Sequence, residues 1–347
     1  MGRARRGGAP VGARARFVLC SHAVRVLVTG GAGYVGSHMV CTLRRAGHEG
    51  VVLDDLSGGH RDAVPGDVPF VQADVADRPR VTATLRDHRI AAVLHFASRI
   101  QVGESVAAPR LYYKGNLAAS IALLESALDA GVDRFVLSST AAIYGAPKSV
   151  PIEEDHPAVP VNPYGETKLA TERMLAAYSR AYGLRYAALR YFNAAGADPA
   201  EPHLGERHTP ETHLVPLVLE TALGARPHVT IFGDDYPTPD GTCLRDYVHV
   251  VDLCEAHLAA LQYLGQGGES GAFNLGTGQG HSVNEVVEAA RHVSGRPIPV
   301  VYGPRRDGDP PALVASCARA ERVLHWKAKR SSLAQIVEDA WAFHARA

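Results

Sequence analysis

The sequence predicts an α/β protein: a doubly wound parallel (Rossmann-type) sheet with a smaller mixed α/β substrate-binding lobe. Short apolar runs alternate with helical patterns between Val24 and Arg190, which is typical of strands in a parallel sheet. A glycine-rich turn follows the first of these runs. After Asn193, Pro, Gly and His become frequent and the expected elements become shorter, which indicates a second lobe.

The composition is that of an ordinary globular protein. The chain has 347 residues, with 36 Lys plus Arg and 36 Asp plus Glu, so nothing points to nucleic acid or to a membrane surface as partner. No apolar run has the length of a bilayer span. Five scattered cysteines without a C-x-x-C motif favour reduced thiols and a cytoplasmic location. Residues 1–23 carry arginines but no acid, and we expect a disordered extension or an upstream start codon there, with a targeting or anion-binding arm as the alternative.

The first strand and its turn, VLVTGGAGYVGSH from Val26 to His38, predict a dinucleotide site. A strand, a glycine turn and a helix N-terminus bring free backbone N–H groups to a pyrophosphate. The second strand, Val51 to Leu53, ends in Asp54, whose carboxylate can bond both ribose hydroxyls and so favours NAD over NADP. The expected cofactor contacts in the turn are Gly30, Gly33, Tyr34, Val35 and Gly36.

The remaining elements of the first lobe follow in order. We expect strands at 69–72, 91–96, 134–139 and 186–190, and helices at 80–88, 116–130 and 164–182. Together they make an NAD-binding domain over residues 24–192. A later segment around 240–277 returns partly to this domain, because Ala272 to Leu275 reads as a strand that rejoins the main sheet.

Residues 193–347 are expected to form mainly the second, substrate-binding lobe. Helices are predicted at 213–223, 251–264 and 283–293, and a strand at 229–232. Ser282 and Glu285 form a capping box for the last of these helices. The substrate cleft is expected where the carboxyl ends of the strands face this lobe.

Tyr164 and Lys168 are the candidate catalytic pair. They lie one helical turn apart, so both side chains point the same way. A lysine ammonium favours the phenolate of a tyrosine, which could then take a proton from a sugar or alcohol hydroxyl. Thr140 ends the preceding strand and could bond the reacting oxygen. Each feature alone has an ordinary structural explanation; their order along the chain favours chemistry.

Further motifs narrow the interpretation: HFASRIQVGES (95–105), SSTAAIYG (138–145), NPYGETKL (162–169), LRYFNAAGA (189–197), IFGDDYPTPDGTCLRDYVHVVDL (231–253) and PRRDGDPP (304–311). With these, the chain from Val24 onward resembles the extended short-chain dehydrogenase/reductase family and, within it, the UDP-sugar 4-epimerases. The resemblance implies reversible interconversion of UDP-glucose and UDP-galactose with bound NAD, and a homodimer.

The resemblance also implies roles for single residues. Tyr164 would take the proton of the sugar 4-hydroxyl while hydride moves from C4 to NAD; the 4-keto sugar would then turn over, and hydride would return to its other face. Thr140 would bond O4, and Lys168 the nicotinamide ribose. The other implied cofactor contacts are Asp54, Asp74, Phe96 and Asn116. The implied substrate contacts are Thr140, Tyr164, Asn193, His213, Leu214, Phe232, Arg245, Arg306, Asp309 and Leu313.

Three positions depart from the family pattern. Ile100 stands where many members have a lysine near the cofactor phosphates, although Arg99 beside it could substitute. His213 replaces an asparagine, so that only a backbone contact would be kept. Leu313 occupies the position that controls sugar size, and leucine there is intermediate between residues that restrict the site to glucose and galactose and those that admit N-acetylated sugars.

Several alternatives remain open. The sugar could be a UDP-N-acetylhexosamine or a UDP-pentose, and a non-catalytic NAD-binding regulator is a rival from another class. A 4,6-dehydratase would need an Asp-Glu pair at the positions of Ala141 and Ala142, so the sequence does not favour that activity. Without the resemblance, Arg245 with Asp246, and Arg305 and Arg306 with nearby acids, would be surface ion pairs. His203, His208 and His213 are expected to lie in a solvated loop, with no metal.

Overall fold

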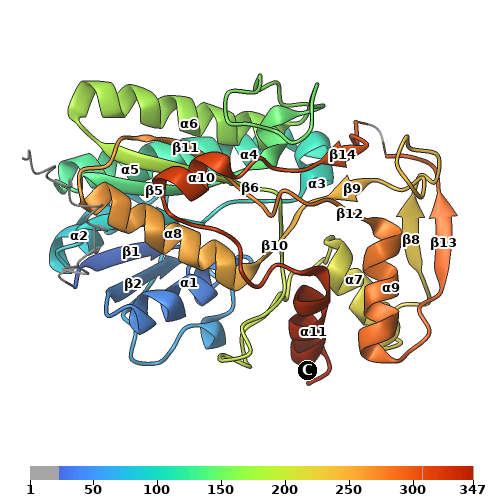
Figure 1. The fold of residues 1–347 in the computed structure, drawn as a ribbon. Coiled ribbons are helices and arrows are strands. Elements are labelled where there is room, and N and C mark those ends of the chain that lie inside the picture. The colour runs from blue at the N-terminus through green and yellow to red at the C-terminus, as the bar shows by residue number, and fades with distance from the viewer. Residues whose placement is uncertain (1–22, 307, 347) are drawn as a thin grey trace, which may run out of the picture.

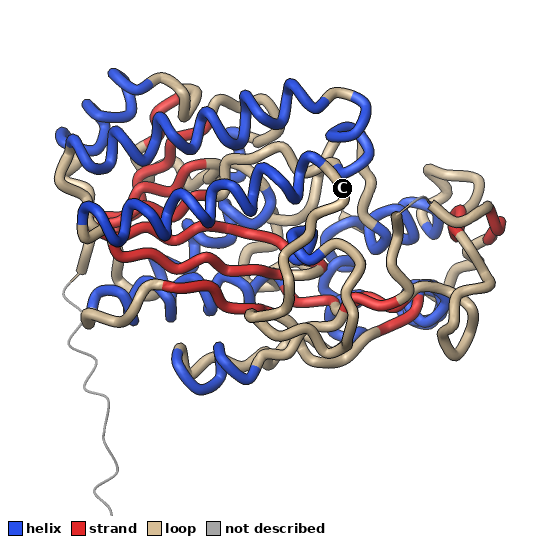
Figure 2. Tube along the Cα trace, turned by 90° about the horizontal axis from the view of Figure 1, so that it is seen from above, coloured by secondary structure: helices blue, strands red, loops and turns tan. Residues whose placement is uncertain are grey.

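The computed structural model describes residues 23–306 and 308–346 (Figure 1). The expected N-terminal extension therefore lies outside the described residues, except for Ala23. Two lobes are seen: a large one built on a central sheet, and a smaller one beyond one end of that sheet (Figure 2). No helix in the described part of the chain combines the length and the apolar character that crossing a membrane requires.

The central sheet has seven parallel strands in the order β11-β6-β5-β4-β1-β2-β3. The sheet confirms the predicted fold class. Strand order reverses between β1 and β4, which is where open α/β sheets bind ligands. The strands are β1 (Arg25–Thr29), β2 (Glu49–Asp54), β3 (Phe70–Gln72), β4 (Ala92–His95), β5 (Arg134–Thr140), β6 (Arg185–Tyr191) and β11 (Gly271–Leu275).

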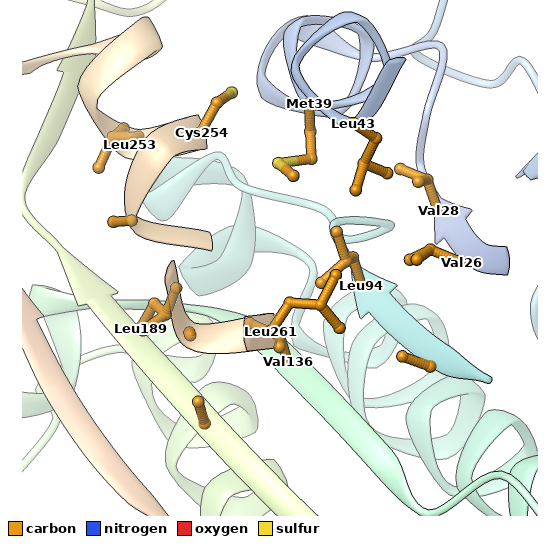
Figure 3. Packing of buried hydrophobic residues seen from close by; sticks show 14 of the residues in the cluster. Val26, Val28, Met39, Leu43, Leu94, Val136, Leu189, Leu253, Cys254 and Leu261 are labelled. Carbon is orange, nitrogen blue, oxygen red and sulfur yellow. The ribbon is translucent and has the colours of Figure 1, made fainter. Parts of the chain in front are cut away.

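Helices cover both faces of this sheet. On one face lie α1 (Tyr34–Arg45), α8 (Val250–Gly265) and the short α10 (Ala318–Val323); on the other lie α2 (Arg78–Asp87), α5 (Ala119–Asp129) and α6 (Pro163–Tyr182). Figure 3 shows Met39 and Leu43 of α1 above the side chains of β1 and β4. Fully burying such a side chain contributes roughly 1.5–3 kcal/mol, so these contacts hold α1 against the sheet.

The long helix α6 has clear start and stop signals. The Asn162 side chain accepts a hydrogen bond from the Gly165 N–H at 2.9 Å, and Pro163 occupies the first helical position. Gly183 ends the helix in the left-handed conformation, with φ of 74°. These caps place Tyr164 in the first turn, immediately beside the carboxyl end of β5.

The connection between β4 and β5 is less regular than the sequence predicts. The helix expected over 116–130 is present as α5 (Ala119–Asp129) with a π-helical segment (Tyr113–Ala118) directly before it, and two short helices that were not predicted, α3 (Val102–Ala107) and α4 (Pro109–Tyr112), precede that segment. Two 3₁₀ turns, Arg61–Ala63 and Ala141–Tyr144, complete the first lobe.

The second lobe packs three helices: α7 (Leu214–Ala222), α9 (Val283–Ser294) and α11 (Leu333–His344). The capping box of Ser282 and Glu285 is present. Helix α11 and the short α10 are not among the sequence expectations. Small sheets complete the lobe: β8 (Val229–Phe232) with β13 (Val300–Gly303), β7 (Asn193–Ala195) with β10 (Tyr247–His249), and β9 (Leu244–Arg245) between β12 (His281–Ser282) and β14 (Ala312–Leu313).

Candidate active site

The glycine turn after β1 is a cradle of bare backbone. A Cβ on Gly36 would lie 2.1 Å from the Gly30 carbonyl oxygen, and one on Gly30 would lie 2.5 Å from the Ala97 nitrogen. Gly30 also has a φ of 71°, which favours glycine. The α1 N-terminus has no side-chain cap, so the N–H groups of its first turn, from Tyr34 to Gly36, are available to an anion. This geometry fits the pyrophosphate of a dinucleotide.

Asp54 lies at the end of β2, where the sequence places it. Its carboxylate accepts hydrogen bonds from the Ala32 N–H at 2.9 Å and from the Leu56 N–H at 2.8 Å. Burial raises the pKa of Asp54, and these two hydrogen bonds oppose the change. The carboxylate therefore joins the glycine turn to β2. Asp74 lies after the neighbouring strand β3, with an exposed side chain that accepts the Ala76 N–H.

Tyr164, Thr140 and Lys168 gather at the carboxyl end of β5. The Thr140 side chain lies near enough to Tyr164 to affect its pKa, and the Thr140 hydroxyl accepts the Ala142 N–H at 3.1 Å. Burial raises the pKa of Tyr164, and the Thr140 side chain opposes this. Lys168 Nζ donates to the Ser138 carbonyl oxygen at 2.9 Å. The arrangement places a buried phenol, a hydroxyl and a buried amine on one edge of the sheet.

Burial lowers the pKa of Lys168 to about 8, and the charge of Glu172 acts in the opposite direction. The amine is therefore mainly an ammonium at neutral pH. Lys168 contacts the backbone of β5 here, and its expected effect on the Tyr164 phenolate stays a prediction.

A buried polar network lies behind Lys168 and was not predicted from the sequence. Glu172 accepts hydrogen bonds from Arg190 and from the Ser139 hydroxyl. Arg190 Nη1 also donates to Tyr144 Oη at 2.9 Å. The spacing along α6 could have indicated this network, because Tyr164, Lys168 and Glu172 lie four residues apart on one face of the helix. The network ties this face to β5 and β6.

Asn116 does not present a free amide. Its Oδ1 accepts the Arg99 N–H at 2.8 Å and its Nδ2 donates to the Arg99 carbonyl oxygen at 3.0 Å. It thereby holds the chain that follows β4, where Phe96 and Ile100 also lie. The Arg99 side chain, a possible substitute for the lysine missing at Ile100, lies 3.8 Å from Glu104.

Four of the expected substrate contacts form two pairs. Arg245 is joined to Asp309 by an ion pair, and the Arg306 guanidinium lies over the Phe232 ring, with 4.1 Å from Cζ to the ring centroid. The alternative pairing of Arg245 with Asp246 is wrong. Asp246 is fully buried and accepts hydrogen bonds from the backbone N–H groups of Thr277, Gly278 and Ala315 instead.

Three other expected substrate contacts lie in elements of the second lobe. Asn193 is the first residue of β7, Leu214 is the first residue of α7, and Leu313 lies in β14 against the buried group of Ala141, Ile143 and Tyr144. No side chain caps the N-terminus of α7, so its backbone N–H groups suit a phosphate.

The structure corrects the expectation for the histidine-rich loop. His208 and His213 meet two carboxylates, Glu206 and Glu211, which were not singled out from the sequence. The His213 ring faces these carboxylates, whereas His203 is exposed. Burial would lower the pKa of His213, but the two carboxylates raise it. The Glu206 side chain is only 5% exposed, so this part of the loop is not simply solvated.

The sequence of this fold and site matches a known family. The NAD dependent epimerase/dehydratase family matches residues 26–276, and the chain belongs to this family. The UDP-glucose 4-epimerase of Halalkalibacterium halodurans is 51% identical over 319 residues, which are 92% of this chain and 95% of that protein. The UDP-glucose 4-epimerase of Azospirillum brasilense is 52% identical over 316 residues, 91% of this chain and 90% of that one.

A solved structure gives the same result. The crystal structure of UDP-glucose 4-epimerase from Brucella ovis in complex with NAD has a TM-score of 0.89 to this chain and 46% sequence identity. The match covers 92% of this chain and 98% of that one.

Proposed function

We propose that the chain interconverts UDP-glucose and UDP-galactose by inverting C4 of the sugar, with NAD as resident cofactor. The observation that supports this most is the grouping of Tyr164, Thr140 and Lys168 at the carboxyl end of β5. The relatives of this chain, which carry the name UDP-glucose 4-epimerase and match over nine tenths of its length, agree with the proposal.

The glycine turn and Asp54 would hold the cofactor. Gly30 and Gly36 let the backbone of the turn pack closely, so that the free N–H groups at the start of α1 can face a phosphate, and the buried Asp54 carboxylate suits ribose hydroxyls. When bound there, NAD supplies reversible acceptance of a hydride from the sugar carbon. Lys168 would bond the nicotinamide ribose, and Phe96 and Asn116 would border the nicotinamide.

Tyr164 would be the acid and base of the reaction. Its oxygen takes the proton of the sugar 4-hydroxyl in the first half of the reaction and returns a proton in the second. Thr140, whose side chain lies near Tyr164, orients the reacting oxygen. Because burial raises the pKa of Tyr164, the phenol is protonated at rest. Bound positive charge would then be needed to favour its phenolate.

The uridine diphosphate would be held by the second lobe. Arg245 and Arg306 provide permanent positive charge in planar guanidinium groups that suit phosphate oxygens, and the uncapped N-terminus of α7 at Leu214 adds N–H donors. Phe232 would lie near the uracil, with Asn193 and Asp309 at the substrate. The His213 side chain takes no part, because its ring faces Glu206 and Glu211.

Proton NMR of the anomeric signals tests the proposal. Purified protein is incubated separately with UDP-galactose and with UDP-N-acetylgalactosamine, without and with added NAD. Conversion of UDP-galactose to UDP-glucose is the expected result. Conversion of the second sugar as well would mean that Leu313 leaves the pocket open, and Leu313→Tyr should then abolish only that activity. No conversion of either sugar would remove the assignment and turn attention to UDP-pentoses or a regulatory role.

We also propose a homodimer in the cytoplasm. Val106, Leu111, Tyr113 and Ile121, on α4, α5 and the segments beside them, leave between 40% and 63% of their surface exposed. A second copy covering this surface would explain so many exposed apolar side chains. The cytoplasm suits the free thiols of the described cysteines.

Light scattering at micromolar concentration should give the mass of a dimer. Ile121→Glu should shift it towards the monomer, and Val301→Glu, at an exposed position on β13, should not. A monomeric mass for the unaltered protein would contradict the dimer.

A further inference from the structure

Two Glu-x-His sequences in one loop converge on a single point. Glu206 and His208 precede a turn at Thr209 and Pro210, and Glu211 and His213 follow it. One ligand atom from each of the four side chains lies within 4.8 Å of the other three. His213 Nδ1 lies 2.7 Å from Glu206 Oε1 and 2.8 Å from Glu211 Oε1. His208 Nδ1 lies 3.2 Å from Glu206 Oε1.

The donor set suits a divalent transition-metal ion. Imidazole nitrogen is a borderline ligand and carboxylate oxygen a hard one, and Zn²⁺ accepts both. Bonds of about 2.0–2.2 Å in a tetrahedron put neighbouring ligand atoms about 3.4 Å apart. The separations of 2.7, 2.8 and 3.2 Å are shorter than this value because the groups are hydrogen-bonded without an ion, so the side chains would have to move apart slightly to admit one.

Burial and charge also favour a cation. The side chains of Glu206 and Glu211 are only 5% and 4% exposed. Two carboxylates in such surroundings need compensating positive charge, which a protonated His213 supplies in part and a divalent ion would supply in full. One divalent ion with two neutral imidazoles gives a site of zero net charge.

The carboxylate of Glu211 is held in place before any ion arrives. Its Oε1 accepts the backbone N–H groups of Thr212 at 2.7 Å and of His213 at 2.8 Å. A ligand that is already oriented loses less entropy on binding. We propose that Glu206, His208, Glu211 and His213 form a binding site for a divalent transition-metal ion such as Zn²⁺.

The position of this site gives it a structural role. The loop of residues 196–213 crosses from the second lobe to the cofactor turn: Tyr34 Oη donates to the Gly196 carbonyl oxygen at 2.6 Å, and Arg207 pairs with Asp62 at 2.8 Å. His208 lines the same small pocket as Gly33 and Tyr34. A metal ion would therefore fasten this loop between the cofactor turn and the first turn of α7.

Titration calorimetry with Zn²⁺ on the full-length, chelator-treated protein tests the site. We expect one ion per chain, and a loss of affinity of at least about 100-fold in His208→Gln, since loss of groups that only support a metal ligand already costs 10–100-fold. His203→Gln is the matched control, because His203 is an exposed histidine of the same loop. It should bind Zn²⁺ as the unaltered protein does.

Thermal unfolding gives a second readout that needs no sugar substrate. Zn²⁺ should raise the unfolding temperature of the unaltered protein and of His203→Gln, but not of His208→Gln. Equal Zn²⁺ affinity in His208→Gln, or no binding by the unaltered protein, would overturn the proposal and leave the cluster as an ion-pair network. Neither result depends on epimerase activity, so failure of the metal site and failure of the proposed function are separate outcomes.

Discussion

Glu172 of α6 and Arg190 of β6 form an ion pair inside the protein, with 2.6 Å between Glu172 Oε2 and Arg190 Nη2. Their side chains are only 7% and 10% exposed. Glu172 lies one helical turn beyond Lys168 and two turns beyond Tyr164, so the pair fixes α6 against the sheet near the site. It is a positioning element for the groups that would carry the chemistry.

Breaking this pair should cost much stability. Glu172→Gln leaves the Arg190 charge buried without its partner, which costs about 3–5 kcal/mol in the free energy of unfolding. Denaturant unfolding measures the loss. The matched control is Glu288→Gln, which breaks the exposed pair of Glu288 and Arg291 and should cost at most about 1 kcal/mol. Equal losses in the two variants would show that the buried pair contributes no more than a surface pair.

Tyr164→Phe should keep the fold and the cofactor while losing turnover. Removal of the proton-transfer group is expected to lower kcat by about 10²–10⁴-fold. The NMR assay measures turnover, and the cofactor released on denaturation measures retained NAD. Tyr178→Phe is the control on the same helix, because Tyr178 bonds Glu125 away from the site. Near-normal turnover in Tyr164→Phe would remove Tyr164 from the acid–base role.

Gly36→Ala should abolish cofactor retention. The added Cβ would lie 2.1 Å from the Gly30 carbonyl oxygen, so the turn must open. Gly66→Ala is the comparison, since a Cβ there meets nothing within 4 Å. The NAD content of the purified proteins distinguishes them: we expect almost none in Gly36→Ala and a normal amount in Gly66→Ala. Full NAD content in both would mean that the turn does not form the pyrophosphate site.

Acid should destabilise the protein partly through His257. Burial lowers the pKa of this histidine to about 4, and the bond with the Leu253 carbonyl oxygen opposes the change. The unfolded chain takes up this proton near pH 6.5, whereas the folded chain does so only near pH 4. Stability is therefore lost as the pH falls from 6.5 to 4, by about 3 kcal/mol for one such group.

The variant His257→Gln removes this titration and should flatten the dependence of the unfolding free energy on pH between 6.5 and 4. His292→Gln, at an exposed position, should leave the dependence unchanged. Denaturant unfolding at several pH values compares the two variants. Parallel curves for the unaltered protein and His257→Gln would exclude the buried histidine as a source of acid sensitivity.

The spacing of apolar residues predicted the strands and most helices well, because the burial of apolar side chains determines where these elements form. The seven strands of the central sheet each carry buried apolar residues, and the expected return of Ala272 to Leu275 is confirmed by β11. The π-helical segment at Tyr113–Ala118 was not predicted, since an extra residue in a turn leaves no mark in a 3.6-residue pattern. That segment contains Asn116, which holds the backbone of Arg99.

Within the site, local spacing gave Tyr164 and Lys168, but contacts across the chain had to come from the structure. The partner of Arg245 is Asp309, 64 residues away, and not its neighbour Asp246. Glu206 meets His213 only because a turn brings the two halves of the loop together. Pairings of this kind depend on tertiary packing, which one sequence does not reveal.

The edge strand β11 has a consequence for biosynthesis. It pairs with β6, yet residues 192–270, which include α7, β8 and α8, separate the two, so the ribosome must synthesise this long segment before the sheet can be completed. Until then the nascent chain exposes the unpaired edge of β6, a template for aggregation that a chaperone would have to shield. A chain truncated before Gly271 should accordingly be recovered as insoluble aggregate rather than as a free NAD-binding domain.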